Sequence, residues 1–214
     1  MTTTPQFRTD IEDPTRFEAD ILAFEASDRE NPFVKGGIVF VGSSSVRLWD
    51  DLQSDFAPIP VLNRGFGGSH LSDSVYYSNR IVTNYQPRAV VIYAGENDLG
   101  NNFSGQHVFE LLKQFVAKVH AEAPDTEIFA MSVKPSPGRG EAIHQIRITN
   151  ALTREWAETQ PKVTFIDVVE PMLGEDGIGR GELFVEDGIH MTRAGYEIWA
   201  AVVKPYMTPL FEEQ

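Results

Sequence analysis

Short, mostly apolar runs alternate with longer amphipathic segments along the chain. The runs are bounded by turn-forming residues, which is typical of strands that are buried on both faces of a parallel sheet. They predict strands at residues 38–41, 59–62, 89–93, 127–133 and 163–168. The strongest strand signal is the run Ala89 to Tyr93.

Between these runs, apolar residues recur at helical spacing. The spacing predicts helices at about 14–26, 71–85, 108–119, 143–156 and 192–206. Asp13 followed by Pro14 is a typical helix start, and Thr192 is the expected cap of the last helix. We also expect Ser45 to cap a short helix from Val46 to about Asp51.

This alternation of strands and helices predicts one α/β domain spanning residues 1–214, with a parallel sheet covered on both faces. Residues 1–35 are expected to form an N-terminal helical extension packed on that domain. In such folds, ligands bind beyond the carboxyl ends of the strands, near the point where strand order reverses.

Charge and composition exclude several classes of function. The formal net charge is −13. Because an acidic surface repels phosphate backbones and anionic lipid heads, we expect no nucleic-acid partner and no stable membrane insertion. The chain has no cysteine, which excludes disulfides, thiolate metal sites and cysteine nucleophiles. Residues 1–20 contain no apolar core flanked by positive charge, so we expect no signal peptide and a cytoplasmic location.

Four polar blocks lie at the ends of strands or before the last helix: Gly42-Ser43-Ser44-Ser45, residues 63–70, Gly95-Glu96-Asn97-Asp98, and residues 186–190. Because the carboxyl ends of parallel strands meet at one edge, we expect these blocks to converge there. Together they supply a hydroxyl, glycine amides, a side-chain amide and an Asp/His pair. These are the groups that an acyl-transfer site needs.

The four blocks resemble those of the SGNH hydrolase (GDSL-like lipase/esterase) family, in family order. Gly42-Ser43-Ser44 is similar to the Gly-Asp-Ser block, with Ser43 in place of the usual Asp. Gly68, Asn97 and the pair Asp187 and His190 match the remaining blocks. The resemblance implies a flavodoxin-like, three-layer α/β/α sandwich with five parallel strands. It also implies a serine hydrolase; we expect neither cofactor nor metal.

The chemistry of the residues supports the same roles. A serine hydroxyl needs a base within hydrogen-bond reach, and His190 has Asp187 three residues before it to orient the imidazole. His70 is the competing base, with Asp73 as its only nearby carboxylate, which a helix start explains equally well. Ser43 and Ser45 are adjacent candidate hydroxyls, but strand-end geometry and the family alignment favour Ser44.

The negative oxygen of a tetrahedral intermediate needs hydrogen-bond donors. We predict an oxyanion hole formed by the backbone amides of Ser44 and Gly68 and by the side-chain amide of Asn97. Glycine suits position 68 because the backbone must approach the substrate closely. Replacement of the family's Asp by Ser43 is expected to leave the site intact, with a loop that is braced differently.

The sequence predicts the substrate only as a class. We expect a small-molecule carboxylic ester with a short- to medium-chain acyl group, cleaved through an acyl-enzyme. Apolar residues near the blocks either line the pocket or belong to the core: Trp49, Phe66, Leu99, Phe103, Met172, Leu173, Phe184 and Ile189. Arg64, Lys134 and Arg139 are candidate contacts for an anionic substrate group.

Several alternatives stay open. Carbohydrate O-deacetylase, lysophospholipase and thioesterase activities occur in the same family. A protein of another class, binding flavin or phosphate through residues 42–45, would be yellow if it held flavin, but it leaves Asp187 and His190 unexplained. A third alternative is an inactive scaffold of the same fold.

Overall fold

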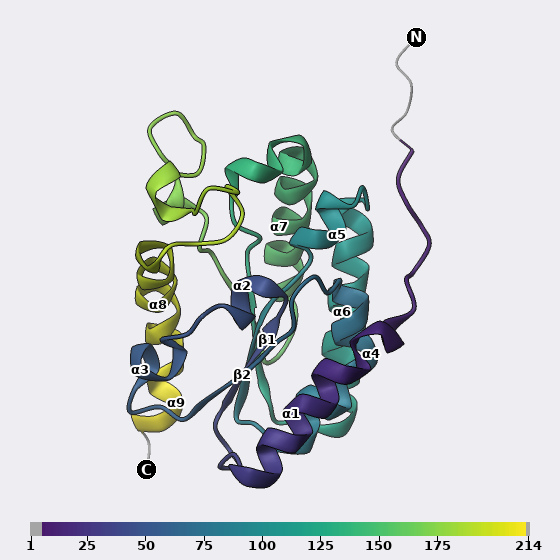
Figure 1. Ribbon diagram of the computed structural model, residues 1–214, viewed down its shortest axis with the longest axis vertical. Helices are drawn as coiled ribbons and strands as arrows, with labels where there is room; N and C mark the ends of the chain where they lie inside the picture. Colours follow the sequence, from purple (N-terminus) through teal and green to yellow (C-terminus); the bar gives the residue numbers. More distant parts are fainter. Residues whose placement is uncertain (1–5, 213–214) are drawn as a thin grey trace.

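The apolar runs form one five-stranded parallel sheet in the computed structural model, which describes residues 6–212 (Figure 1). The strands are β1 (Ile38–Gly42), β2 (Val61–Gly65), β3 (Ala89–Tyr93), β4 (Glu127–Met131) and β5 (Val163–Ile166). Their order is β2-β1-β3-β4-β5, and all four pairings are parallel. This order is that of the flavodoxin-like fold, and its switch point lies between β1 and β3.

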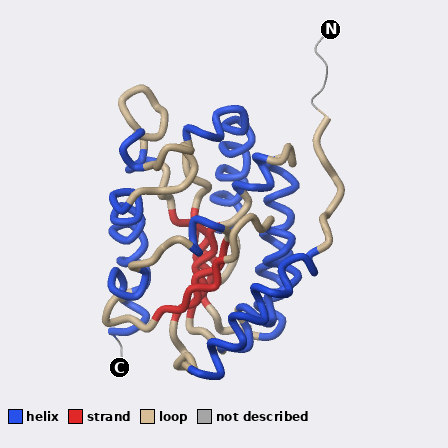
Figure 2. Tube along the Cα trace, in the orientation of Figure 1, coloured by secondary structure: helices blue, strands red, loops and turns tan. Residues whose placement is uncertain are grey.

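Helices cover both faces of the sheet, as Figure 2 shows, and complete a three-layer sandwich. The α-helices are α1 (Glu18–Glu30), α2 (Ser44–Arg47), α3 (Leu52–Phe56), α4 (Leu71–Ile81), α5 (Glu96–Gly100), α6 (Gly105–Glu122), α7 (Ile143–Ala157), α8 (Arg193–Met207) and α9 (Pro209–Glu212). Five 3-10 helices join them: Pro14–Phe17, Thr83–Tyr85, Pro137–Ala142, Glu170–Met172 and Gly181–Leu183. None of the helices within residues 6–212 combines the length and apolarity needed to cross a membrane.

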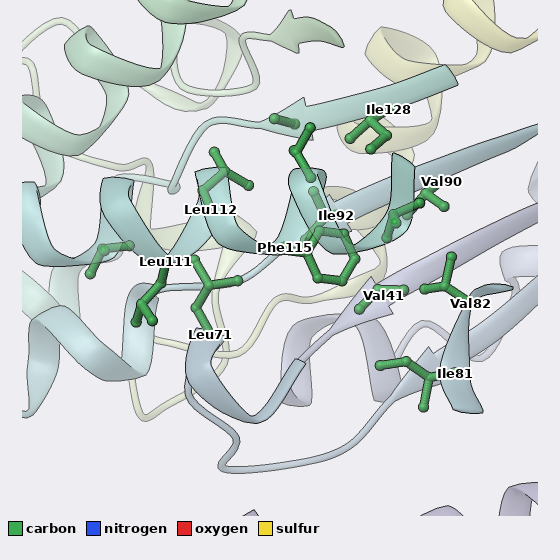
Figure 3. Close-up of a cluster of buried hydrophobic side chains, with 14 of the residues drawn as sticks. Val41, Leu71, Ile81, Val82, Val90, Ile92, Leu111, Leu112, Phe115 and Ile128 are labelled. Atoms are coloured by element: carbon green, nitrogen blue, oxygen red, sulfur yellow. The ribbon is translucent and has the colours of Figure 1, made fainter. Parts of the chain in front are cut away.

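The alternation of side chains along each strand divides the core in two. In β1, Val39 and Val41 face one apolar cluster, whereas Ile38 and Phe40 face the other. The first cluster lies between the sheet and α1, α4, α6 and α7, and Figure 3 shows its centre around Phe115. Both faces of the strands are therefore buried, as continuous apolar runs predict.

The second cluster is rich in aromatic residues and packs α2, α3 and α8 against the sheet. Trp49 is central to it, with its ring 5.7 Å from that of Phe40 and 5.8 Å from that of Trp199. The indole nitrogen of Trp49 donates to Asp55 at 2.7 Å, so the buried polar atom is satisfied. This packing fixes the start of α8 relative to the end of β1.

Most predicted elements are present, with shifted ends. β2 begins at Val61 rather than 59 because Pro60 has no N–H for the sheet. Asp13 caps the first helical segment through the backbone N–H of Thr15 at 2.9 Å, as predicted. The expected cap Ser45 is wrong: it lies inside α2, whose N-cap residue is Ser43.

The N-terminal helix α1 packs on the sheet domain through Ile21, which is fully buried. Ion pairs also join it to α4, since Arg80 contacts Glu18 at 2.8 Å and Glu25 at 2.6 Å. Exposed ion pairs of this kind add little stability, so burial of Ile21 should dominate the attachment.

A buried carboxylate joins α5 to α4. Asp98 is only 1 % exposed and accepts the backbone N–H of Leu71, the first residue of α4, at 3.1 and 3.2 Å. Burial raises the pKa of Asp98 to about 7 because the low-dielectric interior disfavours the charged form.

If α1 is an integral part of the domain, Ile21→Ala should lower the free energy of unfolding by about 2–5 kcal/mol, because it leaves a cavity. Leu22→Ala is the matched control, since Leu22 is the next residue of the same helix but is 50 % exposed; it should cost less than about 0.5 kcal/mol. Urea denaturation measures both. Equal small effects would mean that α1 does not unfold cooperatively with the sheet.

Asp98 should make the protein less stable as pH rises. Its pKa in the folded state is above its unfolded value, so the folded protein holds the extra proton between about pH 4 and 7. The resulting stabilisation, on the order of a few kcal/mol, is complete below this window and lost above it. Asp98→Asn should remove this component. The difference in unfolding free energy between variant and wild type, measured at pH 5 and pH 8, checks it; a pH-independent difference would contradict it.

Candidate active site

The nucleophile candidate Ser44 lies where β1 passes into α2, at the carboxyl edge of the sheet. The turn is tight, because a Cβ at Gly42 would lie 2.1 Å from the carbonyl oxygen of Tyr93 on the neighbouring strand. Only glycine fits there without moving backbone. The short α2 therefore begins at the switch point of the sheet, with Ser44 as its first residue.

The structure brings His190 to this serine. The Nε2 atom of His190 lies 2.8 Å from Ser44 Oγ, although the two residues are 146 positions apart. Its other ring nitrogen, Nδ1, lies 2.6 Å from Asp187 Oδ2. The other carboxylate oxygen of Asp187 accepts the backbone N–H groups of Ile189 at 2.7 Å and His190 at 2.9 Å. The Asp187–His190 turn is thus closed on itself by its own aspartate.

These hydrogen bonds set the charge state of Asp187 and the tautomer of His190. The side-chain hydrogen bond from His190, aided by the two backbone donors, lowers the pKa of Asp187 to about 2. A carboxylate beside Nδ1 requires a proton on that nitrogen, which leaves the lone pair of Nε2 facing the hydroxyl of Ser44. This is the tautomer that a general base needs.

The other residues predicted for the oxyanion hole, Gly68 and Asn97, follow β2 and β3, the two strands that pair with β1. Gly68 has φ +82°, and nothing lies within 4 Å of the place where its Cβ would be, so its backbone is open to an incoming group. Asn97 Nδ2 donates to the carbonyl of Ser69 at 3.1 Å, and Asn97 Oδ1 accepts from Arg139 at 3.1 Å. These two contacts fix which end of the amide is the donor. The contact with Ser69 uses only one of the two N–H groups of Asn97.

Within residues 6–212, neither neighbouring serine is hydrogen-bonded to the ring of His190. Ser43 is buried and makes no capping hydrogen bond through its side chain. Ser45 Oγ instead accepts from the ammonium of Lys134 at 3.1 Å. The carbonyl of Ser45 accepts from Tyr196 at 2.9 Å, and Asn63 donates to the next carbonyl of α2 at 2.6 Å. The loop is braced by these side chains rather than by a residue at position 43.

The competing base His70 is placed elsewhere. It is 2 % exposed and is the N-cap of α4, where its carbonyl accepts the backbone N–H of Asp73 at 3.1 Å. Asp73 in turn accepts the backbone N–H of His70 at 2.8 Å, and the ring nitrogen Nε2 lies 2.7 Å from Asn101. The carboxylate of Asp73 thus bonds the backbone of His70, so the pair His70 and Asp73 forms a helix start.

A cavity of about 670 Å³ is connected to Asn97 through Arg139, which lines it, although Asn97, Ser44 and His190 do not. It is lined by both polar and apolar groups, among them Phe7, Leu99, Asn102, Phe103, Arg139, Glu141, His144 and Gln145. Its wall at Gly138 also contacts the catalytic turn, because the amide of Gly138 donates to the carbonyl of Gly188 at 2.9 Å.

Several residues that the sequence offered as pocket walls belong to the core. The buried apolar ones, which pack in the two clusters rather than line the cavity, are Trp49, Phe66, Met172 and Phe184. Of the three candidate cations, Arg64 is buried and paired with Asp28, and Lys134 is fully buried and paired with Glu96. Only Arg139 reaches the cavity.

The sequence did not indicate the residues that hold the site residues in place through hydrogen bonds: Lys134 with Glu96, Tyr196, and Arg139 as a partner of Asn97. One available signal is that Lys134 directly follows the predicted strand 127–133, because a parallel strand brings the next residue to the carboxyl edge of the sheet. Nothing in the sequence indicates that its ammonium points inward.

Solved structures of esterases share this architecture. A GDSL-like lipase from Bacteroides thetaiotaomicron VPI-5482 superposes with a TM-score of 0.75 at 23 % identity, covering 92 % of this chain and 98 % of that one. A family 3 carbohydrate esterase from Clostridium thermocellum superposes with a TM-score of 0.64 at 18 % identity, covering 82 % of this chain and 96 % of that one. At these identities the likeness shows the fold.

Sequence comparison adds a relative and a family. The chain is 26 % identical over 180 residues to platelet-activating factor acetylhydrolase IB subunit alpha2 of Gallus gallus, an alignment that covers 78 % of this chain and 73 % of that protein. The model of the GDSL-like Lipase/Acylhydrolase family matches residues 37–198, which include all four polar blocks. The protein therefore belongs to the GDSL-like Lipase/Acylhydrolase family.

Proposed function

We propose that this protein hydrolyses carboxylic esters through an acyl-enzyme on Ser44, with His190 as base and Asp187 as its orienting partner. The observation that carries the proposal is the continuous chain of hydrogen bonds from Asp187 through His190 to the Ser44 hydroxyl, at 2.6 and 2.8 Å. Membership of an acylhydrolase family supports ester cleavage as the reaction.

The geometry allows each proton transfer of such a reaction. His190 Nε2 takes the hydroxyl proton as Ser44 Oγ attacks the ester carbonyl, and the imidazolium is stabilised by Asp187. When the tetrahedral intermediate collapses, the same nitrogen returns the proton to the leaving alcohol. A water molecule then repeats the sequence on the acyl-enzyme, releasing the acid and regenerating Ser44.

The oxyanion of each tetrahedral intermediate would be held by the amides of Ser44 and Gly68 and by Asn97. The contact with Arg139 holds the amide oxygen of Asn97 away from this position, so that an N–H and not a carbonyl faces the negative charge. Donors that are already oriented require little reorganisation during the reaction.

For the substrate we propose a short- to medium-chain acyl ester of a polar alcohol. The adjoining cavity includes hydrogen-bonding groups of Asn102, Arg139, Glu141 and Gln145, which suit hydroxyl groups better than a long alkyl chain. The same lining favours carbohydrate O-deacetylation as the second candidate. Two of the similar proteins bear compatible names, an acetylhydrolase and a carbohydrate esterase.

Ser44→Ala should abolish turnover of p-nitrophenyl acetate and butyrate, with a loss of about 10⁴-fold or more in kcat, because the attacking atom is gone. Ser54→Ala, which changes an exposed serine of α3, serves as the control and should keep wild-type rates. Rates for esters of increasing chain length should fall beyond medium-chain acyl groups. Wild-type activity in Ser44→Ala with intact fold would rule out this nucleophile.

Asp187→Asn should lower kcat by about 10²- to 10⁴-fold, because the imidazole of His190 loses the acceptor that fixes its tautomer. The pKa of Asp187 is about 2, so its carboxylate is charged from about pH 4 to pH 8, and the loss should be present throughout that range. Plate-based rate profiles of the wild type and the variant measure it. A variant that keeps the wild-type kcat would show that Asp187 is not the partner of the base.

A further inference from the structure

The helix that carries the nucleophile is too short to hold itself in place. α2 has four residues and no side-chain cap at Ser43. Its position therefore depends on contacts from other elements. The contact nearest to the nucleophile is made by Ser45, whose hydroxyl accepts from Lys134 Nζ at 3.1 Å.

Lys134 is fully buried, and all three hydrogens of its ammonium have acceptors. Besides Ser45, they are the hydroxyl of Tyr93 at 3.2 Å and a carboxylate oxygen of Glu96. Glu96 is 3 % exposed, and its other oxygen accepts from the hydroxyl of Ser136. Each polar side-chain atom of this cluster has a partner, so its geometry is fully determined.

The cluster is connected to three of the four segments that carry the predicted site residues. Ser45 directly follows the nucleophile, and Glu96 directly precedes the oxyanion residue Asn97. Ser136 begins the loop whose Gly138 amide donates to the carbonyl of Gly188 at 2.9 Å, within the catalytic Asp-His turn. One buried ion pair therefore links three segments that are distant in sequence.

We infer that Lys134, held by Glu96, is a positioning residue that fixes the hydroxyl and the backbone amide of Ser44 through Ser45. A buried ion pair is seldom more stabilising than apolar packing of the same volume, so stability alone is a weak reason for one at this place. Misplacement of a nucleophile by about 1 Å costs on the order of 100-fold in rate. This inference rests on the proposed function, because it assigns a role in the same reaction.

The inference also accounts for the serine at position 43. Position 43 has no carboxylate to hold the turn, and the ammonium of Lys134 holds it through Ser45 instead. Ser45 is the connection between that ammonium and α2, which makes it the most selective position to test.

The first test is Ser45→Ala, which removes the connection without leaving a charge unpaired. The variant should lower kcat by about 10- to 100-fold, with KM changed less than about twofold. It should also slow covalent labelling of Ser44 by a fluorophosphonate to a similar extent. Ser78→Ala is the matched control: Ser78 is equally buried and bonds only a carbonyl of its own helix α4. It should change neither rate, even if both variants melt at slightly lower temperature.

The second test is a double-mutant cycle that combines Ser45→Ala with the paired change Lys134→Met/Glu96→Gln. The paired change removes both charges together, so that the protein is expected to fold. This variant should lose at least as much kcat as Ser45→Ala, and adding Ser45→Ala to it should cause little further loss, because the connection has already been broken. Labelling of Ser45→Ala at the wild-type rate, or losses that multiply independently, would overturn the positioning role. A wild type that neither reacts with the fluorophosphonate nor cleaves esters would instead overturn the proposed function itself, and the positioning role with it.

Discussion

The hydrogen bond between Ser44 and His190 joins two loops that the chain delivers to one edge of the sheet from positions 146 residues apart. Neither loop is rigid by its own structure. One begins a helix of four residues, and the other is a turn closed by Asp187. The contact therefore depends on the sheet, the two apolar clusters and the buried ion pair of Lys134 and Glu96, which together hold the two loops at the right distance. Most of the packing in the molecule can be understood as meeting this requirement.

Much of the fold could be predicted because its signals are local. The predicted strand Ala89 to Tyr93 begins and ends at the same residues as β3. Helical periodicity predicts the ends of α6 and α8 to within a few residues. Asp13 also caps the first helical segment as expected. The errors arise where a local preference competes with the sheet or with a distant partner. Because Pro60 has no N–H, β2 begins only at Val61. Ser45 lies inside α2, where its hydroxyl bonds Lys134 instead of capping a helix.

The site was predictable to a different depth. Ser44, His190, Asp187 and Asn97 could be proposed because each belongs to a short polar block at a strand end or before the last helix, and the structure brings His190 and Ser44 together. Whether they catalyse ester hydrolysis stays a prediction. The inward direction of Lys134 could not be inferred, because burial of an ammonium depends on Glu96 and Tyr93, which lie about 40 positions earlier. The contact between Arg139 and Asn97 likewise joins distant positions, so the sequence predicts Arg139 only as a substrate contact.

Gly42 has a consequence for how the protein could acquire new specificity. Its Cα packs so closely against the Tyr93 carbonyl that β1 and β3 admit no side chain between them. Position 42 therefore cannot carry another side chain, and adaptation to a different ester must come from residues that line the cavity. The segment of residues 137–145, which lines the cavity, is the part best placed to change without disturbing this contact.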